Sequence, residues 1–283
     1  MDKMKILLLG STGAVGTAFE YACRDRNIEC ISYTHDDIDV TDRVQLLETV
    51  VREDPYVVIN CTGLVGINQC AESPSSAMKI NINTPKYLSR ICKDLDVILV
   101  HFSTHTVFDG FNKIYYTEFV NPNPQNTYGA TKLFGEEFVS NTCNKYYIFR
   151  FPTLFGPRQN DKIGFVDKVI EWIKEGRDLR IADDKLDSPT YTIDAANTIL
   201  NIIENKGEYG LYHIANDGGI SLYEFVEELL KIMNADNKLE RAKDSDFKSL
   251  EPKAVNTMMR SDKIPPMRNW KEALKEYVDT YVK

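Results

Sequence analysis

Tyr128 and Lys132 lie four residues apart in this 283-residue chain, in the segment Tyr128-Gly-Ala-Thr-Lys132. On a helix this spacing places both side chains on one face. A nearby ammonium favours the ionised form of a phenol, so we expect Lys132 to lower the pKa of Tyr128 and make it a stronger acid. Such an acid can protonate the alkoxide that forms when a ketone accepts a hydride. The alternative is that Tyr128 packs the helix while Lys132 is solvated.

Two further features favour the catalytic interpretation of this pair. Ser103 and Thr104 end an apolar run, and ligands of open parallel sheets bind beyond the carboxyl ends of the strands. Upstream, Gly10, Gly13 and Gly16 lie between an apolar run and a helical pattern. This arrangement lets a backbone turn tightly and present a helix N-terminus to a pyrophosphate. Glycines also allow a tight strand-to-helix turn without any ligand, but the position of the loop favours a dinucleotide.

The next strand end bears on the choice of cofactor. An acidic residue there would hold the ribose 2′-hydroxyl of NAD, and this chain has Thr34 at that position, with no arginine after it. His35 either assists a 2′-phosphate or is a surface residue. We therefore favour NADP over NAD. Asp39 and Val40 either line the adenine pocket or cap the following helix.

Alternating apolar runs and helical patterns predict the elements that position these residues. We expect strands at 5–9, 29–34, 56–60, 97–102 and 146–151, and helices at 14–23, 44–51, 75–93 and 125–139, with Thr41 as an N-cap and a disturbance at Pro85. Near-continuous apolar strands are typical of a parallel sheet covered on both faces. The predicted fold class is α/β, a Rossmann-like doubly wound parallel sheet with a smaller C-terminal substrate-binding domain.

Strand signals become sparse after Pro152. Ser221 and Glu224 have the spacing of a capping box, residues 234–248 suggest a solvated loop or an exposed helix, and a last helix is expected at 270–281. We assign residues 1–152 and about 190–214 to the dinucleotide-binding domain. Residues 153–189 and 215–283, again with approximate limits, form the predicted substrate-binding domain.

The overall composition excludes several classes of function. The net charge of −8 argues against general binding of nucleic acid. No apolar run approaches the roughly 20 residues of a membrane span. The short apolar run ended by Gly10 is unlike a signal peptide, so we expect a cytoplasmic protein. The six cysteines contain no Cys-x-x-Cys pair, and we predict neither a disulfide framework nor a metal site.

At several places the chain resembles the dTDP-4-dehydrorhamnose reductase family of extended short-chain dehydrogenases/reductases. The segment Ser103-Thr104-His105-Thr106-Val107-Phe108-Asp109-Gly110 resembles the family signature Ser-Thr-Asp-Tyr-Val-Phe-Asp-Gly. Further similar segments are the G-x-x-G-x-x-G loop, 58–63, 70–72 with 77–81, Tyr128-x-x-x-Lys132, 150–156, 188–192 and 252–257. The similarity covers nearly the whole chain.

The resemblance implies a set of site residues and a reaction. Thr104, Tyr128 and Lys132 would be catalytic, with Thr104 on the ketone, Tyr128 as the acid and Lys132 on the nicotinamide ribose. The implied cofactor contacts are Gly10, Thr12, Gly13, Ala14, Val15, Gly16, Thr34, His35, Asp39, Val40, Cys61, Thr62, Gly63, Leu64, Asn81, Ser103, Tyr128, Lys132 and Phe151. The implied substrate contacts are Thr104, His105, Val107, Phe108, Thr153 and Asn256. The reaction would be the NAD(P)H-dependent last step of dTDP-L-rhamnose synthesis, on a nucleotide-sugar substrate.

Departures from the family pattern concentrate around the sugar. His105 and Thr106 replace Asp-Tyr, Thr153 replaces a tryptophan, Lys185 a glutamine and Asp187 a glycine. One alternative is therefore a reductase or epimerase-reductase for another nucleotide sugar. A second is a non-catalytic NADP-binding regulatory subunit similar to that of methionine adenosyltransferase, against which the intact Thr104–Tyr128–Lys132 set argues. A homodimer is left open.

Overall fold

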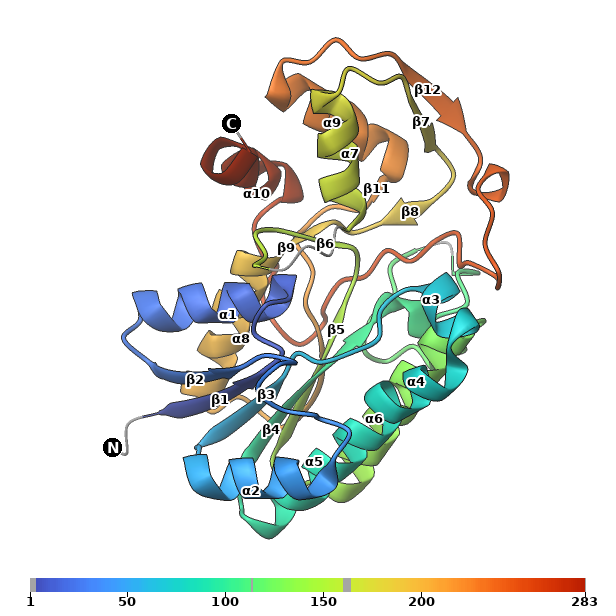
Figure 1. Cartoon of the computed structure of the whole chain (residues 1–283). Coiled ribbons are helices and arrows are strands. Elements are labelled where there is room, and N and C mark those ends of the chain that lie inside the picture. The colour runs from blue at the N-terminus through green and yellow to red at the C-terminus, as the bar shows by residue number, and fades with distance from the viewer. Residues whose placement is uncertain (1–3, 113, 160–163, 283) are drawn as a thin grey trace.

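A computed structural model describes residues 4–112, 114–159 and 164–282. Its centre is a six-stranded parallel sheet in the order β10-β5-β4-β3-β1-β2 (Figure 1). These strands are β1 (Lys5–Leu9), β2 (Glu29–Tyr33), β3 (Val57–Asn60), β4 (Ile98–Thr104), β5 (Tyr146–Phe151) and β10 (Gly210–His213). The α/β fold class predicted from the sequence is confirmed.

Apolar side chains on both faces hold this sheet between two layers of helices. In β1, Ile6 and Leu8 pack on one face and Leu7 and Leu9 on the other, because successive side chains of a strand alternate. The helices are α1 (Ala14–Asp25) and α8 (Thr192–Glu204) on the first face, and α2 (Arg43–Glu53), α5 (Thr84–Asp94) and α6 (Thr127–Thr142) on the second. The sheet is therefore buried on both sides, as its apolar strands require.

The predicted helix at 75–93 is divided into three parts. They are α4 (Pro74–Met78), a π-helical turn (Lys79–Asn83) and α5. Pro85 lies in the first turn of α5, where a missing backbone N–H costs no helical hydrogen bond. A short α3 (Ile67–Glu72) precedes them.

The N-cap of α2 was predicted at the wrong residue. Asp42, not Thr41, caps this helix, and its Oδ1 accepts hydrogen bonds from Val44 N at 2.8 Å and Gln45 N at 3.3 Å. Thr41 instead donates its hydroxyl to Asp39 Oδ1 at 2.8 Å. A carboxylate is also favoured at this position because it faces the positive end of the helix dipole.

The remaining part of the chain has its own apolar cluster, which includes Phe155, Val169, Phe225, Trp270 and Tyr277. Its helices are α7 (Phe165–Lys174), α9 (Leu222–Met233) and α10 (Trp270–Tyr277), and its two-stranded sheets join β6 (Leu154–Phe155) to β9 (Thr190–Tyr191), β7 (Leu179–Ala182) to β12 (Leu239–Ala242), and β8 (Leu186–Asp187) to β11 (Ile220–Ser221). In Figure 1 this part lies over the carboxyl ends of the large sheet. The residue limits proposed for two domains stay a prediction.

The structure confirms one local expectation here and overturns another. Ser221 Oγ accepts from Glu224 N at 3.2 Å, and Glu224 Oε2 accepts from Ser221 N at 3.2 Å, which is the predicted capping box. Within 234–248, however, β12 pairs in parallel with β7, so the expectation of a solvated loop or exposed helix was wrong for residues 239–242. The sequence of this strand carries little apolar pattern, because only Leu239 and Ala242 face the interior.

None of the helices among the described residues is long and apolar enough to cross a membrane.

Candidate active site

The glycine loop between β1 and α1 is shaped for close approach of a ligand. Gly10 has φ +79°, and its N–H donates to Tyr33 O at 2.8 Å. A side chain on Gly16 would collide with the backbone of Gly10 and Ser11, so this glycine lets the start of α1 lie against the loop. Gly13 is the N-cap of α1. Thr12, Ala14 and Val15 lie on the same turn, at the positive end of the helix.

The loop after β3 lies beside this turn. Thr62 is anchored to Asn60 Oδ1 through its N–H at 3.1 Å and its hydroxyl at 2.6 Å. The buried Asn81 accepts from Leu64 N at 2.9 Å and donates to Leu64 O at 3.0 Å. It also donates to Thr131 Oγ1 at 3.2 Å, which ties this loop to α6.

Gly63 brings the loop to Lys132. A Cβ built on Gly63 would lie 3.5 Å from Asn81 Oδ1 and 4.0 Å from Lys132 Nζ. Cys61, which donates its N–H to Leu9 O at 2.9 Å, joins the loop to β1. The structure thus gathers Gly10, Cys61, Gly63 and Lys132 at one edge of the sheet.

The end of β2 holds the residues expected at the adenosine end of a cofactor. Thr34 donates its N–H at 2.8 Å and its hydroxyl at 2.7 Å to Asp37 Oδ2. The side chain of His35 is 84% exposed and lies 3.3 Å from Asp36. Asp37 was not singled out from the sequence, because it lies three residues beyond Thr34 and reaches it only where the loop folds back.

Asp39 and Val40 close the same loop toward the helices. Asp39 accepts hydrogen bonds from Thr41, and Val40 O accepts from Thr84 Oγ1 at 3.0 Å. Val40 packs against the cluster on the second face of the sheet. Both residues therefore have a structural role besides the adenine contact proposed for them.

Thr104 and Tyr128 meet where β4 ends and α6 begins. The Tyr128 and Thr104 side chains are hydrogen-bonded. Asn126 caps α6 by accepting from Gly129 N at 2.9 Å. A side chain on Gly129 would collide with Thr106 O, so this glycine allows the first turn of α6 to approach β4.

The electrostatics of Tyr128 differ from the sequence-based expectation. Burial raises its pKa to about 12, and the hydrogen bond from Thr104 lowers it only in part. The expected lowering of the Tyr128 pKa was wrong, because removal of the phenol from water raises it by more than the Thr104 hydrogen bond lowers it. Tyr128 therefore keeps its proton at neutral pH and is available as a proton donor.

Lys132 is buried and its own ionisation is weakened. Removal from water lowers its pKa to about 8, against an opposing effect from Glu136. Glu136 is in turn paired with Arg150, whose Nε and Nη2 donate to the carboxylate at 2.9 Å and 2.6 Å. This buried ion pair links α6 to β5.

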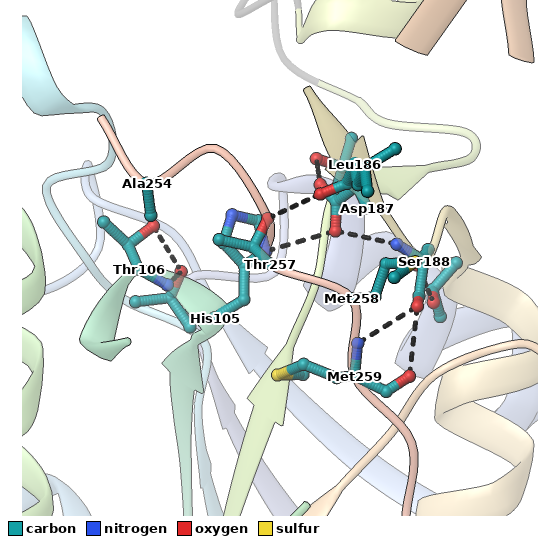
Figure 2. Close-up of polar contacts among 12 residues, drawn as sticks. His105, Thr106, Leu186, Asp187, Ser188, Ala254, Thr257, Met258 and Met259 are labelled. Atoms are coloured by element: carbon teal, nitrogen blue, oxygen red, sulfur yellow. Dashed lines mark hydrogen bonds and ion pairs between the residues drawn. The ribbon is translucent and has the colours of Figure 1, made fainter. Parts of the chain in front are cut away.

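A second polar group lies at the ends of β4 and β5, where the sugar was expected (Figure 2). Asp187 is fully buried. Its carboxylate accepts from the hydroxyl of Thr153 and, at 2.8 Å, from Ser188 N. His105 Nδ1 lies 3.7 Å from Asp187 Oδ1. The structure thus brings together Thr153 and His105, two predicted substrate residues, around Asp187. The sequence analysis noted Asp187 only as a departure from the family pattern.

Other predicted site residues are packed in the interior. Val107 and Phe108 are fully buried, and the Phe108 ring stacks on Tyr116 with centroids 4.2 Å apart. Phe151 is buried in the cluster on the first face of the sheet. Asn256 donates to Asn112 O at 2.7 Å and so shapes the loop that follows. The contacts that these side chains make are structural, and their ligand contacts stay predictions.

The site fits a dinucleotide on two independent observations. The loop of Gly10 and Gly16 is a cradle that side chains would fill. Ser103 Oγ is buried without a hydrogen-bond partner among the described residues, at the carboxyl end of β4. No group of three His, Cys, Asp or Glu side chains in the described ranges is placed to hold a metal ion.

Comparisons with known proteins identify similar chains over the full length. The model of the RmlD substrate binding domain family matches residues 4–283. The dTDP-4-keto-6-deoxy-D-glucose reductase of Streptomyces niveus is 27% identical, covering 95% of this chain and 94% of its own. The crystal structure of a dTDP-4-dehydrorhamnose reductase from Clostridium acetobutylicum is 33% identical, with a TM-score of 0.92 and coverage of 98% and 99%. The crystal structure of dTDP-4-dehydrorhamnose reductase from Bacillus anthracis in complex with NADP is 26% identical, with a TM-score of 0.92 and coverage of 98% of this chain and 99% of its own.

Proposed function

The chain belongs to the RmlD substrate binding domain family, and from this membership we propose that it is an NAD(P)H-dependent reductase of the 4-keto group of a nucleotide-linked 6-deoxy sugar. The specific reaction that we propose is that of dTDP-4-dehydrorhamnose reductase, which gives dTDP-L-rhamnose. The observation that carries the proposal is the hydrogen-bonded pair of Tyr128 and Thr104 at the end of β4, in the same sheet whose first strand leads into the cradle of Gly10 and Gly16.

The chain's own residues supply binding and proton transfer. Thr104, which is hydrogen-bonded to Tyr128, would bind the ketone oxygen, and Tyr128 would donate its proton to that oxygen. Bound NAD(P)H would supply the hydride for the ketone carbon. Lys132, next to Gly63, would hold the nicotinamide ribose and stabilise the phenolate that remains after proton transfer. The pyrophosphate would lie at the N-terminus of α1, on the loop from Gly10 to Gly16.

For the cofactor we propose NADPH over NADH. Thr34 stands at the end of β2 where an acid would hold the ribose of NAD, and the relative from Bacillus anthracis was crystallised with NADP. The carboxylate of Asp37, which accepts a hydrogen bond from Thr34, would repel the negative charge of a 2′-phosphate. The ratio of kcat/KM for the two cofactors therefore measures which of these effects is larger.

A panel of nucleotide-linked keto-sugars tests the proposed reaction, with NADPH oxidation as the readout. We expect turnover with a dTDP-linked 4-keto-6-deoxyhexose. Tyr128→Phe should lose roughly 10²- to 10⁴-fold in kcat while cofactor binding is retained, since it removes only the proton donor. Equal rates for Tyr128→Phe and the parent would contradict the assignment of the acid.

The panel also separates the alternatives. Turnover of a different nucleotide sugar would favour a related reductase or epimerase-reductase, which the polar contact of Thr153 with Asp187 makes the second candidate. Failure with every sugar, together with tight NADP binding, would favour a non-catalytic regulatory subunit.

A further inference from the structure

His105, Thr153 and Asp187 come from three separate segments, and both His105 and Thr153 contact the Asp187 carboxylate. Figure 2 shows His105 facing Asp187. Asp187 has no exposed surface, and its two oxygens already accept from Thr153 and Ser188. A buried carboxylate with only these partners still attracts a further donor. His105 Nδ1, at 3.7 Å from Oδ1, is the titratable group that faces it.

The ring of His105 is neutral near pH 7. Removal from water lowers its pKa, Lys185 acts in the same direction, and Asp187 opposes them. Lys185 is engaged elsewhere, since its ammonium donates to Ala254 O. A neutral imidazole carries one N–H, on either Nδ1 or Nε2.

The position of Asp187 decides between these two tautomers. With the proton on Nδ1, the N–H dipole points toward the carboxylate. With the proton on Nε2, a lone pair on Nδ1 would face the negative charge in a medium of low dielectric constant. Nδ1 is buried and has no other hydrogen-bond partner among the described residues. The distance of 3.7 Å is longer than a hydrogen bond, so the interaction is a directed electrostatic one that a small ring rotation would tighten.

We infer that Asp187 is a positioning residue that holds His105 as the Nδ1–H tautomer, so that Nε2 offers the sugar pocket a hydrogen-bond acceptor next to Thr104. This inference rests on the proposed function, because it assigns the pocket to a sugar. An acceptor at this place selects a substrate with a donor, a hydroxyl or an amine, on a ring carbon near the ketone. The side chain of His105 is 15% exposed, so part of the ring remains accessible to such a group.

Thr153 extends the arrangement. Its hydroxyl donates a hydrogen bond to Asp187, so only its methyl group and backbone remain to contact the sugar. Its role is therefore to hold the Asp187 carboxylate in place rather than to bind the substrate. The His105 side chain, 15% of which is exposed, keeps one ring nitrogen, Nε2, for the sugar.

The tautomer can be measured directly by long-range ¹H–¹⁵N correlation on the full-length protein with ¹⁵N-labelled histidine. His105→Gln assigns the His105 signals among those of the four histidines. We expect a protonated Nδ1 and an unprotonated Nε2 at neutral pH. Asp187→Asn should shift the His105 equilibrium toward Nε2–H, because the negative charge is removed at constant shape. Asp183→Asn is the matched control: Asp183 lies four residues before Asp187 and pairs with Lys243, so its replacement should leave the His105 signals unchanged.

Kinetics test the consequence for the substrate. The probes are the sugar that the parent reduces and an analogue in which the hydroxyl beside the ketone is a methyl ether. We expect the parent to prefer the hydroxyl form by roughly 100-fold in kcat/KM, and His105→Phe to prefer it by less than about tenfold. The loss should appear mainly in KM, with the NADPH dissociation constant unchanged.

The outcomes separate the inference from the proposed function. An Nε2–H tautomer in the parent, or equal discrimination by the parent and His105→Phe, would overturn the inference while the reductase assignment stands. The expected tautomer together with no turnover of any keto-sugar would overturn the proposed function, and with it the assignment of the pocket to a sugar.

Discussion

Burial sets the protonation states of the two residues that would carry the chemistry. Tyr128, with a pKa of about 12, remains a phenol over the whole working range, which suits the direction of ketone reduction. Lys132, with a pKa of about 8, titrates close to neutrality. The pH dependence of reduction should therefore report the lysine and not the tyrosine.

We expect kcat/KM for the keto-sugar to be constant below about pH 8 and to fall up to tenfold per pH unit above it. The ammonium of Lys132 is present below its pKa and is lost as the pH rises through it. Lys132→Arg, which keeps its charge, should be slower but should lack this fall. A fall at the same pH in that variant would assign the titration to another group.

The sequence predicts these residues better than it predicts their environment. The spacing of Tyr128 and Lys132 is local and therefore visible in the sequence. Asp187 reaches His105 across 82 positions of the chain, and no local pattern reports that contact. The pKa of Tyr128 was misjudged for the same reason, since the atoms that exclude water come from distant segments.

Helix α6 positions Tyr128 and Lys132, the proposed catalytic pair, through close backbone contacts and one buried charge pair. Gly129 and Gly135 allow it to approach Thr106 and Asn81, because a side chain at either position would collide with those carbonyl groups. One turn after Lys132, Glu136 binds Arg150 of β5 with two hydrogen bonds. The guanidinium also lies over the Phe108 ring, 5.2 Å from its centroid.

Glu136→Ala should lower the free energy of unfolding by about 3–5 kcal/mol, because it leaves the Arg150 charge buried and uncompensated. Urea unfolding of the full chain measures the change. Glu137→Ala, at the neighbouring exposed position, is the control and should change stability by less than about 0.5 kcal/mol. Similar values for both variants would show that the ion pair does not hold α6 in place.

The sequence predicts helices and strands correctly where the apolar pattern of the element extends over several residues. The five strands expected in the first half are all present, because four of them are apolar runs that are almost wholly buried, while the edge strand β2 is only partly buried. The strand β12 was missed, since a two-stranded edge buries only Leu239 and Ala242 of it. The π-helical turn before Thr84 was also missed, because it is set by packing against α6 rather than by residue type.

Buried neutral histidines make the stability of the whole molecule depend on pH. The pKa of His213 is lowered to about 4 and that of His101 well below its usual value, in both cases chiefly by removal from water. His213 Nδ1 lies 3.2 Å from the carbonyl oxygens of Tyr116 and Arg260, which the neutral ring can satisfy as a donor. His101 Nδ1 lies 3.4 Å from Asn60 Nδ2.

Stability should therefore fall as the pH is lowered from 7 to 5. Unfolded histidines take up protons below about pH 6.5, whereas the folded ones do not until the pH reaches their lowered pKa values. Each of these two residues then costs about 2 kcal/mol at pH 5, or roughly 4 kcal/mol together. Urea unfolding at several pH values measures the loss.

His35→Gln is the control for that measurement, since His35 is exposed and its replacement should leave the pH dependence unchanged. His213→Asn should reduce the slope by about one proton. A stability that is equal at pH 7 and pH 5 would contradict the assignment of neutral buried rings.

The return of the chain to the large sheet has a consequence for synthesis on the ribosome. Strand β10 and helix α8, which complete the edge and one face of the sheet, follow residues 154–191 of the other part. A nascent chain that ends near residue 152 would therefore leave the apolar sides of Tyr147 and Phe149 in water. The half of the chain that holds the large sheet should therefore not mature as an early translation product, and an amino-terminal fragment expressed alone should aggregate.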